Sequence, residues 1–131
     1  MSGKKIRSGI EILADEPGTG PTVERKHTYL VRLKMWLNRG EPIRWQEPWG
    51  LIDRARLEDA GTTLITDLRV DRVNLISGLF YGVEGMRVGG TRKLRISPHL
   101  AYGECGVPGI IPSNAVLIAE FHIVEERTFQ S

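Results

Sequence analysis

The residues with the most chemical content lie in one loop, residues 102–112. The loop reads Tyr-Gly-Glu-Cys-Gly-Val-Pro-Gly-Ile-Ile-Pro. Its three glycines allow backbone conformations that other residues avoid, and its two prolines fix φ and remove amide donors. A solvated loop normally carries polar side chains, whereas this one carries Tyr102, Val107, Ile110 and Ile111. Such apolar side chains either pack on the core or line a binding surface, and both interpretations remain open at this point.

Other kinds of reactive site lack the residues they need. His27, His99 and His122 are scattered, without cysteines or carboxylates at ligand spacing, so we expect no metal site. The single cysteine, Cys105, has no adjacent base, so we expect an inert thiol. No phosphate loop, dinucleotide fingerprint or Gly-x-Ser-x-Gly sequence occurs, and we expect no cofactor.

Hydrophobic periodicity predicts the strands around this loop. Apolar residues alternate with polar ones over residues 27–37, which predicts a half-buried strand that ends at the turn 38–40. Leu117, Ala119, Phe121 and Ile123 predict a last strand. Shorter strands are expected at 10–13 and 68–73, and a short helix at 53–59.

A helix is predicted directly before the loop, over residues 75–87. Its inward face has helical spacing, and Ser77 stands where an N-cap is expected. The inward residues are Ile76, Leu79, Phe80, Val83 and Met86. Together these elements predict an α+β fold, a twisted antiparallel sheet wrapped around one short helix.

Bulk properties narrow the classes of partner. The chain has 131 residues, which suits one domain, and its net charge of +2 is too small to imply nucleic acid. The basic cluster Arg92-Lys93-Arg95 is expected on a solvated strand face. Without a long apolar run we expect no membrane span or signal peptide, and with one cysteine we expect a cytoplasmic location.

The order of motifs resembles one known family. Residues 82–98 read Gly-Val-Glu-Gly-Met-Arg-Val-Gly-Gly-Thr-Arg-Lys-Leu-Arg-Ile-Ser-Pro, and residues 114–118 read Asn-Ala-Val-Leu-Ile. With the loop from Ala-Tyr-Gly to Gly-Ile-Ile-Pro between them, residues 75–125 resemble the macrolide-binding (FKBP) peptidyl-prolyl isomerases. The resemblance implies an FKBP-like fold and catalysis of cis-trans isomerisation at X-Pro bonds.

This reaction agrees with the absence of reactive groups. The amide loses resonance as it twists, which sets a barrier of about 18–20 kcal/mol. No bond forms or breaks, so a catalyst needs only an apolar cup for the proline ring and donors that hold nearby carbonyls. The resemblance assigns the donors to the Tyr102 hydroxyl and the Ile76 backbone N–H, and an apolar wall to Val107, Ile110 and Ile111.

Several positions depart from the family pattern. Leu79 stands where the family has a tryptophan floor, and Ala119 where it has a phenylalanine. Leu33 stands in place of a tyrosine, and Ile43-Arg44 in place of a Phe-Asp pair. The cup is therefore expected to be less aromatic, unless Trp36, Trp45 or Trp49 compensates.

Two functions follow, and the sequence leaves both open. The first is an isomerase acting on proline-containing segments of unfolded or loop regions, with weak activity and weak binding of macrolides. The second is an isomerase-fold module that binds a peptide or protein with little or no catalysis. Tyr102 and the Gly-Ile-Ile-Pro loop favour the first. The residues that favour the second are Leu79, Ala119, Leu33 and Arg44.

Overall fold

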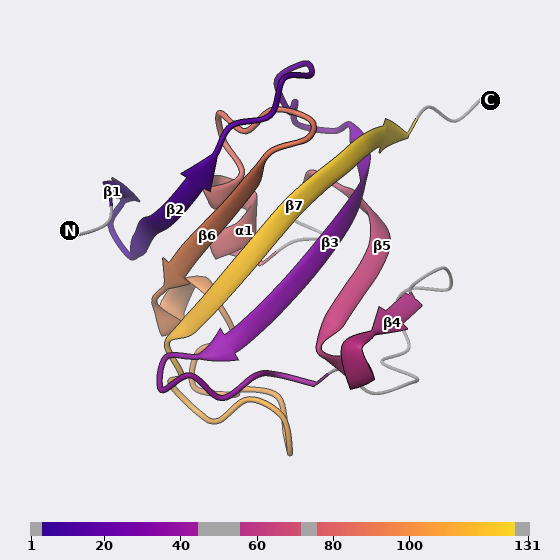
Figure 1. The fold of residues 1–131 in the computed structure, drawn as a ribbon. Coiled ribbons are helices and arrows are strands. Elements are labelled where there is room, and N and C mark those ends of the chain that lie inside the picture. Colours follow the sequence, from indigo (N-terminus) through magenta and orange to yellow (C-terminus); the bar gives the residue numbers. More distant parts are fainter. Residues whose placement is uncertain (1–3, 45–55, 72–75, 128–131) are drawn as a thin grey trace.

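The protein forms one antiparallel sheet with a short helix on one face (Figure 1). The computed structural model describes residues 4–44, 56–71 and 76–127. In these ranges the strand order is β1-β2-β6-β7-β3-β5-β4. The strands are β1 (Lys4–Arg7), β2 (Ile10–Glu16), β3 (Thr28–Leu37), β4 (Arg56–Glu58), β5 (Thr63–Arg69), β6 (Thr91–Ile96) and β7 (Leu117–Arg127). The helix α1 is Ser77–Gly82, and two 3-10 turns are η1 (Asp59–Gly61) and η2 (Pro98–Leu100). The predicted fold class is confirmed.

The two longest strands form the centre of the sheet. β3 and β7 pair antiparallel over almost their whole length, from Thr28 opposite Arg127 to Leu37 opposite Leu117. Their inward side chains are buried as the alternation predicts. These residues are Tyr29, Val31, Leu33, Met35, Leu37, Leu117, Ala119, Phe121 and Ile123. None of the helices in the described ranges has the length and apolar character that a membrane span requires.

The peripheral strands differ from the prediction. β2 continues to Glu16 rather than ending at residue 13, and β5 occupies Thr63–Arg69 rather than starting at 68. The prediction of a helix over 53–59 is wrong where the structure describes this segment, because residues 56–58 form β4 and pair with β5. Strand β1 was not predicted. These pieces are short, and their pairing partners rather than their own periodicity decide their structure.

Helix α1 is shorter than predicted and begins differently. Ile76 is its N-cap, in an extended conformation, and Ser77 is already helical and makes no capping hydrogen bond. The predicted Ser77 cap is therefore wrong. Four of the five residues predicted to face inward, Leu79, Phe80, Val83 and Met86, are buried, and Ile76 is half-buried. Val83 and Met86 lie beyond the end of the helix and are still buried, because the turn at 83–85 directs both side chains inward.

Two glycines let α1 lie close to the sheet. A Cβ on Gly78 would lie 2.3 Å from Cγ2 of Ile96, and a Cβ on Gly82 would lie 2.5 Å from Cδ1 of Leu94. Ordinary carbon contacts are about 3.5–4.0 Å. Because positions four apart share a helix face, both glycines face β6. The backbone of the helix therefore lies directly against the side chains of Ile96 and Leu94.

Arg92 fixes the other end of the helix. Its side chain is only 7% exposed, and its Nη1 donates to the carbonyl oxygens of Gly82 (2.8 Å) and Glu84 (2.6 Å). Its Nε and Nη2 donate to the Asp15 carboxylate at 3.2 and 3.3 Å. The expectation that this basic cluster is wholly solvated is therefore wrong for Arg92. A cation at a helix C-terminus also opposes the negative end of the helix dipole.

Candidate functional site

The loop predicted to carry the site belongs to a longer segment, residues 98–116, which we call the flap. Val107 and Ile111 exchange backbone hydrogen bonds of 2.8 Å, and the Asn114 N–H donates to the Gly103 carbonyl oxygen at 2.8 Å. Gly106 has φ of +57°, and a Cβ there would lie 2.3 Å from the Ile111 carbonyl oxygen. The flap is thus a hydrogen-bonded hairpin in which Gly106 cannot be replaced without strain.

The flap is tied to the turn that follows β3. The N–H of Asn38 donates to the Val116 carbonyl oxygen at 3.1 Å. Beside this bond lies a cavity of about 290 Å³, lined mainly by apolar groups. Its lining residues are Leu37, Asn38, Arg39, Pro112, Ala115 and Val116. Of these only Pro112 belongs to the loop that was predicted to carry the site.

The apolar side chains of the flap pack in two ways. Ile111 is 4% exposed and belongs to the core. Tyr102, Val107 and Ile110 are half-buried and pack against the core from its edge. Ile111 is therefore a core anchor, whereas the other three form a half-buried apolar edge whose binding of a ligand stays a prediction.

Tyr102 presents a neutral donor. Within the described residues its hydroxyl has no hydrogen-bond partner, although its backbone carbonyl accepts from the Gly106 N–H at 3.0 Å. Burial raises the pKa of the Tyr102 phenol above its ordinary value of 10. The hydroxyl therefore keeps its proton at neutral pH and is available to donate to a ligand carbonyl.

Ile76 presents a second donor at the start of α1. Its carbonyl oxygen accepts from the N–H groups of Leu79 and Phe80, each at 3.0 Å. Its own N–H meets no acceptor in the described ranges, as is usual for the first N–H groups of a helix. The side chain of Ile76 packs against the core, so packing and hydrogen bonding to a ligand are compatible at this residue.

The remaining apolar residues predicted for the site belong to the buried core. They share one core cluster, with which the half-buried Ile76, Tyr102, Val107 and Ile110 are in contact. We call the buried ones the floor: Leu33, Ile43, Leu79, Ala119 and also Ile111, which was predicted as part of the wall, each at most 4% exposed. All the predicted apolar site residues thus belong to one core cluster or pack against it, and their contacts with a ligand remain a prediction.

Arg44 is the exception among the predicted site residues. It is exposed, and its Nη1 donates to the carbonyl oxygen of Ala60 in η1 at 3.0 Å. The backbone beside it is fixed, because the Ile43 N–H donates to the Met35 carbonyl oxygen at 2.8 Å. Arg44 therefore contributes charge at the margin of the apolar floor and no part of the floor itself.

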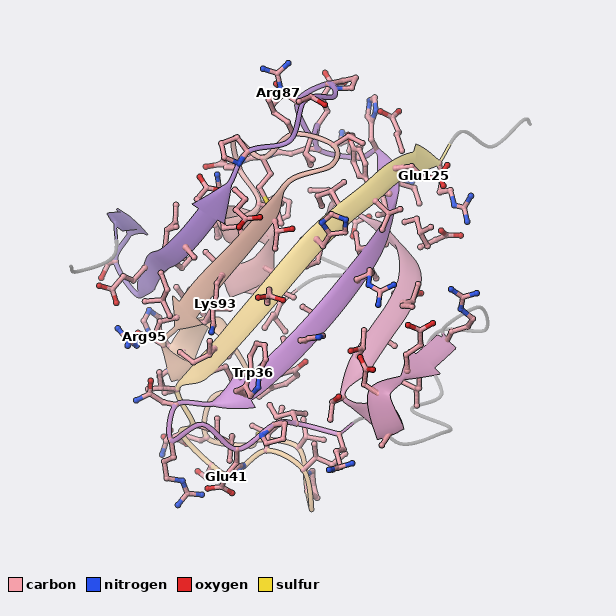
Figure 2. The ribbon with its side chains drawn as sticks, in the orientation of Figure 1. Trp36, Glu41, Arg87, Lys93, Arg95 and Glu125 are labelled. Atoms are coloured by element: carbon pink, nitrogen blue, oxygen red, sulfur yellow. The ribbon has the colours of Figure 1, made fainter. Side chains whose placement is uncertain are left out.

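The tryptophan in β3 does not enlarge the cup. Trp36 lies on the outward face of the sheet, where the Lys93 ammonium is 5.0 Å from its ring centroid (Figure 2). Trp36 therefore does not compensate for the missing aromatic residues, because Leu33, Met35 and Leu37 occupy the inward positions of the strand. Trp45 and Trp49 lie outside the described residues.

Sequence reasoning missed the residues that hold the donors in place. Gly78 and Gly82 set the distance between α1 and β6, and Arg92 binds the helix end to β2. The spacing of Gly78 and Gly82 by four residues was the only signal available, because an Arg92–Asp15 pair separated by 77 positions leaves no local pattern.

Comparison with known proteins identifies the family. The model of the FKBP-type peptidyl-prolyl cis-trans isomerase family matches residues 58–124, just over half of the 131 residues. The chain belongs to this family. The match covers β5, α1, β6, the flap and most of β7, which include both donors.

Fungal FK506-binding proteins are similar to nearly the whole chain. FK506-binding protein 4 of Gibberella zeae is 49% identical over 127 residues, 95% of this chain and 22% of that protein. FK506-binding protein 4 of Chaetomium thermophilum is 33% identical over 123 residues, 94% of this chain and 22% of that protein. The chain thus spans about a fifth of the length of these relatives.

Solved structures share the fold. FkpA from Escherichia coli has a TM-score of 0.64 and 27% identity, covering 90% of this chain and 47% of that chain. The N-terminal domain of FKBP42 from Arabidopsis thaliana has a TM-score of 0.69 at 17% identity, covering 98% of this chain and 94% of that chain, which shows the fold alone. The FKBP-like fold expected from the sequence is confirmed.

Proposed function

We propose that this domain is a peptidyl-prolyl cis-trans isomerase that acts, with low activity, on X-Pro bonds in unfolded or loop segments. One observation carries the proposal. Two donors without an acceptor in the described residues, the Tyr102 hydroxyl and the Ile76 N–H, both belong to residues that pack on the same apolar cluster. Membership of the isomerase family supports the same function.

The arrangement suits a reaction in which no covalent bond changes. The Ile76 N–H and the Tyr102 hydroxyl hold two backbone carbonyls of the substrate, while the proline ring lies against the half-buried Val107 and Ile110. Holding the flanking carbonyls fixes the groups on either side of the amide, so that binding energy is available for its twist. An apolar, water-poor surface further favours the twisted amide, which is less charge-separated than the planar one.

The low activity follows from the small side chains of the floor. Leu79 and Ala119 are 3% and 0% exposed, so neither small side chain extends towards a proline ring as an aromatic residue would. At about 25 cal/mol per Å², losing tens of Å² of contact weakens binding by about 1–2 kcal/mol. That loss corresponds to about 5- to 30-fold in rate or affinity. The same deficit leads us to propose weak binding of macrolides.

A binding module without catalysis is the second candidate, and the aliphatic floor favours it. A titration of ¹⁵N-labelled protein with a short X-Pro peptide separates the two functions. An isomerase shifts the Ile76 and flap amide resonances and also accelerates cis-trans exchange of the peptide. A binding module gives the amide shifts alone. The absence of both effects contradicts a prolyl site here.

A pair of tyrosine variants makes this test specific. Tyr102→Phe removes the proposed donor, whereas Tyr81→Phe changes a tyrosine on α1 whose ring meets Phe80 edge-on at 5.0 Å. The proposal expects loss of exchange enhancement in Tyr102→Phe and its retention in Tyr81→Phe. Equal loss in both variants would assign the effect to packing.

A further inference from the structure

Arg44 is a cation for which the described residues provide no carboxylate. Its hydrogen bond goes to a neutral carbonyl oxygen, that of Ala60, at 3.0 Å. Three basic residues of β3 and of the turn that follows it are neutralised by ion pairs. These pairs are Arg39–Glu41 (2.9 Å), Arg32–Glu58 (3.1 Å) and Lys34–Asp59 (4.0 Å). The Arg44 guanidinium therefore keeps an uncompensated charge among the described groups.

Arg44 is also held at the margin of the candidate site. Its neighbour Ile43 is 2% exposed and lies in the core cluster that includes Leu79 and Ile111. Figure 1 shows the segment after β3 running towards η1 and β4, where the Ala60 carbonyl anchors the guanidinium. A side chain with one fixed hydrogen bond loses less conformational entropy when it binds a second group than a free arginine does.

The acidic residues near Arg44 do not supply the missing anion. Asp59 Oδ2 accepts a hydrogen bond of 2.6 Å from Thr63 Oγ1 and faces Lys34. Glu104, in the flap, is exposed and makes no ion pair within the described ranges. The site thus has a cation, Arg44, beside its floor and an anion, Glu104, on its flap. A charged side chain of the substrate is therefore attracted or repelled according to which of the two it lies near.

We propose that Arg44 makes this site select X-Pro segments with an aspartate or glutamate beside the proline. The inference rests on the proposed function and names its substrate class. Electrostatic complementarity at the exposed margin of a site mainly changes which substrates are preferred and how fast they associate. Arg44 attracts an acidic neighbour of the proline and repels a basic one, so it discriminates in both directions.

The expected effect is modest and depends on salt. One exposed ion pair changes affinity by about two- to fivefold, and repulsion of a lysine widens the ratio between acidic and basic substrates. Because the Debye length falls from about 10 Å at 0.1 M salt to about 3 Å at 1 M, the selectivity must shrink as salt is added.

The test measures exchange rates for six peptides by NMR. Three differ only in the residue before proline (Glu, Leu or Lys), and three only in the residue after it. The variants are Arg44→Gln and Arg44→Glu, with Arg56→Gln as the control. Arg56 is an exposed arginine on β4, so its replacement makes the same change in net charge as Arg44→Gln.

The wild type and Arg56→Gln are expected to process the glutamate peptide faster than the lysine peptide in at least one of the two series. The ratio of the exchange rate of the glutamate peptide to that of the lysine peptide should fall to about one in Arg44→Gln and below one in Arg44→Glu. The same ratio in the wild type and Arg44→Gln would overturn this inference while leaving the isomerase intact. A wild type that accelerates none of the six peptides would instead overturn the proposed function, and this inference with it.

Discussion

Replacing Gly78 with alanine tests the close approach of α1 to the sheet. The new Cβ would lie 2.3 Å from Cγ2 of Ile96 and 2.9 Å from its Cδ1. Ile96 is completely buried on β6, so it has little room to rotate away. Restoring ordinary contact requires the helix to move by roughly 1 Å. Such a movement would displace the Ile76 N–H, which lies two residues earlier at the N-cap of the helix.

The cost combines two opposing effects. Overpacking a core typically destabilises a protein by about 1–3 kcal/mol. Alanine is a better helix former than glycine by about 1 kcal/mol, which offsets part of this. We therefore expect Gly78→Ala to lower the free energy of unfolding by about 1–2 kcal/mol, measured by urea denaturation. Ser77→Ala, at the half-buried neighbouring position, should stay within about 0.5 kcal/mol of the wild type.

A second substitution shows whether the contact with Ile96 is the cause. Ile96→Ala alone removes the clashing carbons and should cost about 2–5 kcal/mol through the cavity it leaves. Adding Gly78→Ala to Ile96→Ala should then cost almost nothing, so the two effects are not additive. A Gly78→Ala protein as stable as the wild type, or fully additive effects in the double variant, would refute the close packing of α1 on β6.

Three further substitutions test the donor, the core and the buried cation. Tyr102→Phe should weaken peptide binding by about 0.5–1.5 kcal/mol in an NMR titration, with little change in unfolding. Because burial raises the pKa of the Tyr102 phenol, this residue should form tyrosinate at a higher pH than an exposed tyrosine does, as followed by the absorbance that Tyr102→Phe removes. Phe80→Ala should lower the free energy of unfolding by about 3–5 kcal/mol, and a loss under about 1 kcal/mol would mean that its ring does not pack inward. Arg92→Met should cost about 2–3 kcal/mol because the Gly82 carbonyl and the Asp15 carboxylate lose a charged donor, and an unchanged urea midpoint would contradict that network.

The sequence predicted the parts of the fold that repeat a simple period. The alternation along β3 and β7 identified their inward residues, and the 3.6-residue spacing identified Leu79, Phe80 and Val83 as buried. The same spacing overestimated the length of α1, because Met86 faces the core from beyond the turn at 83–85. The spacing of apolar residues alone cannot distinguish a long helix from a short helix followed by a turn whose apolar residues also face the core.

Other features depend on residues far apart in the chain. Arg92 is buried because Asp15, Gly82 and Glu84 accept its hydrogen bonds, and none of these contacts leaves a local pattern. β4 has three residues, too few to show alternation, and its pairing with β5 creates it. In the candidate site the glycines and prolines of the flap were informative, whereas the anchoring of Arg44 by Ala60 required the structure.

The cis-trans exchange rate of a short X-Pro peptide, with this protein at substoichiometric concentration, tests the central claim most directly. Exchange spectroscopy measures the rate for peptide alone, with wild type and with Tyr102→Phe. The account predicts faster exchange with wild type and a smaller enhancement, by about two- to tenfold, with Tyr102→Phe. Exchange equal to that of the free peptide, in a sample whose folded state is verified by its NMR spectrum, would contradict the isomerase assignment.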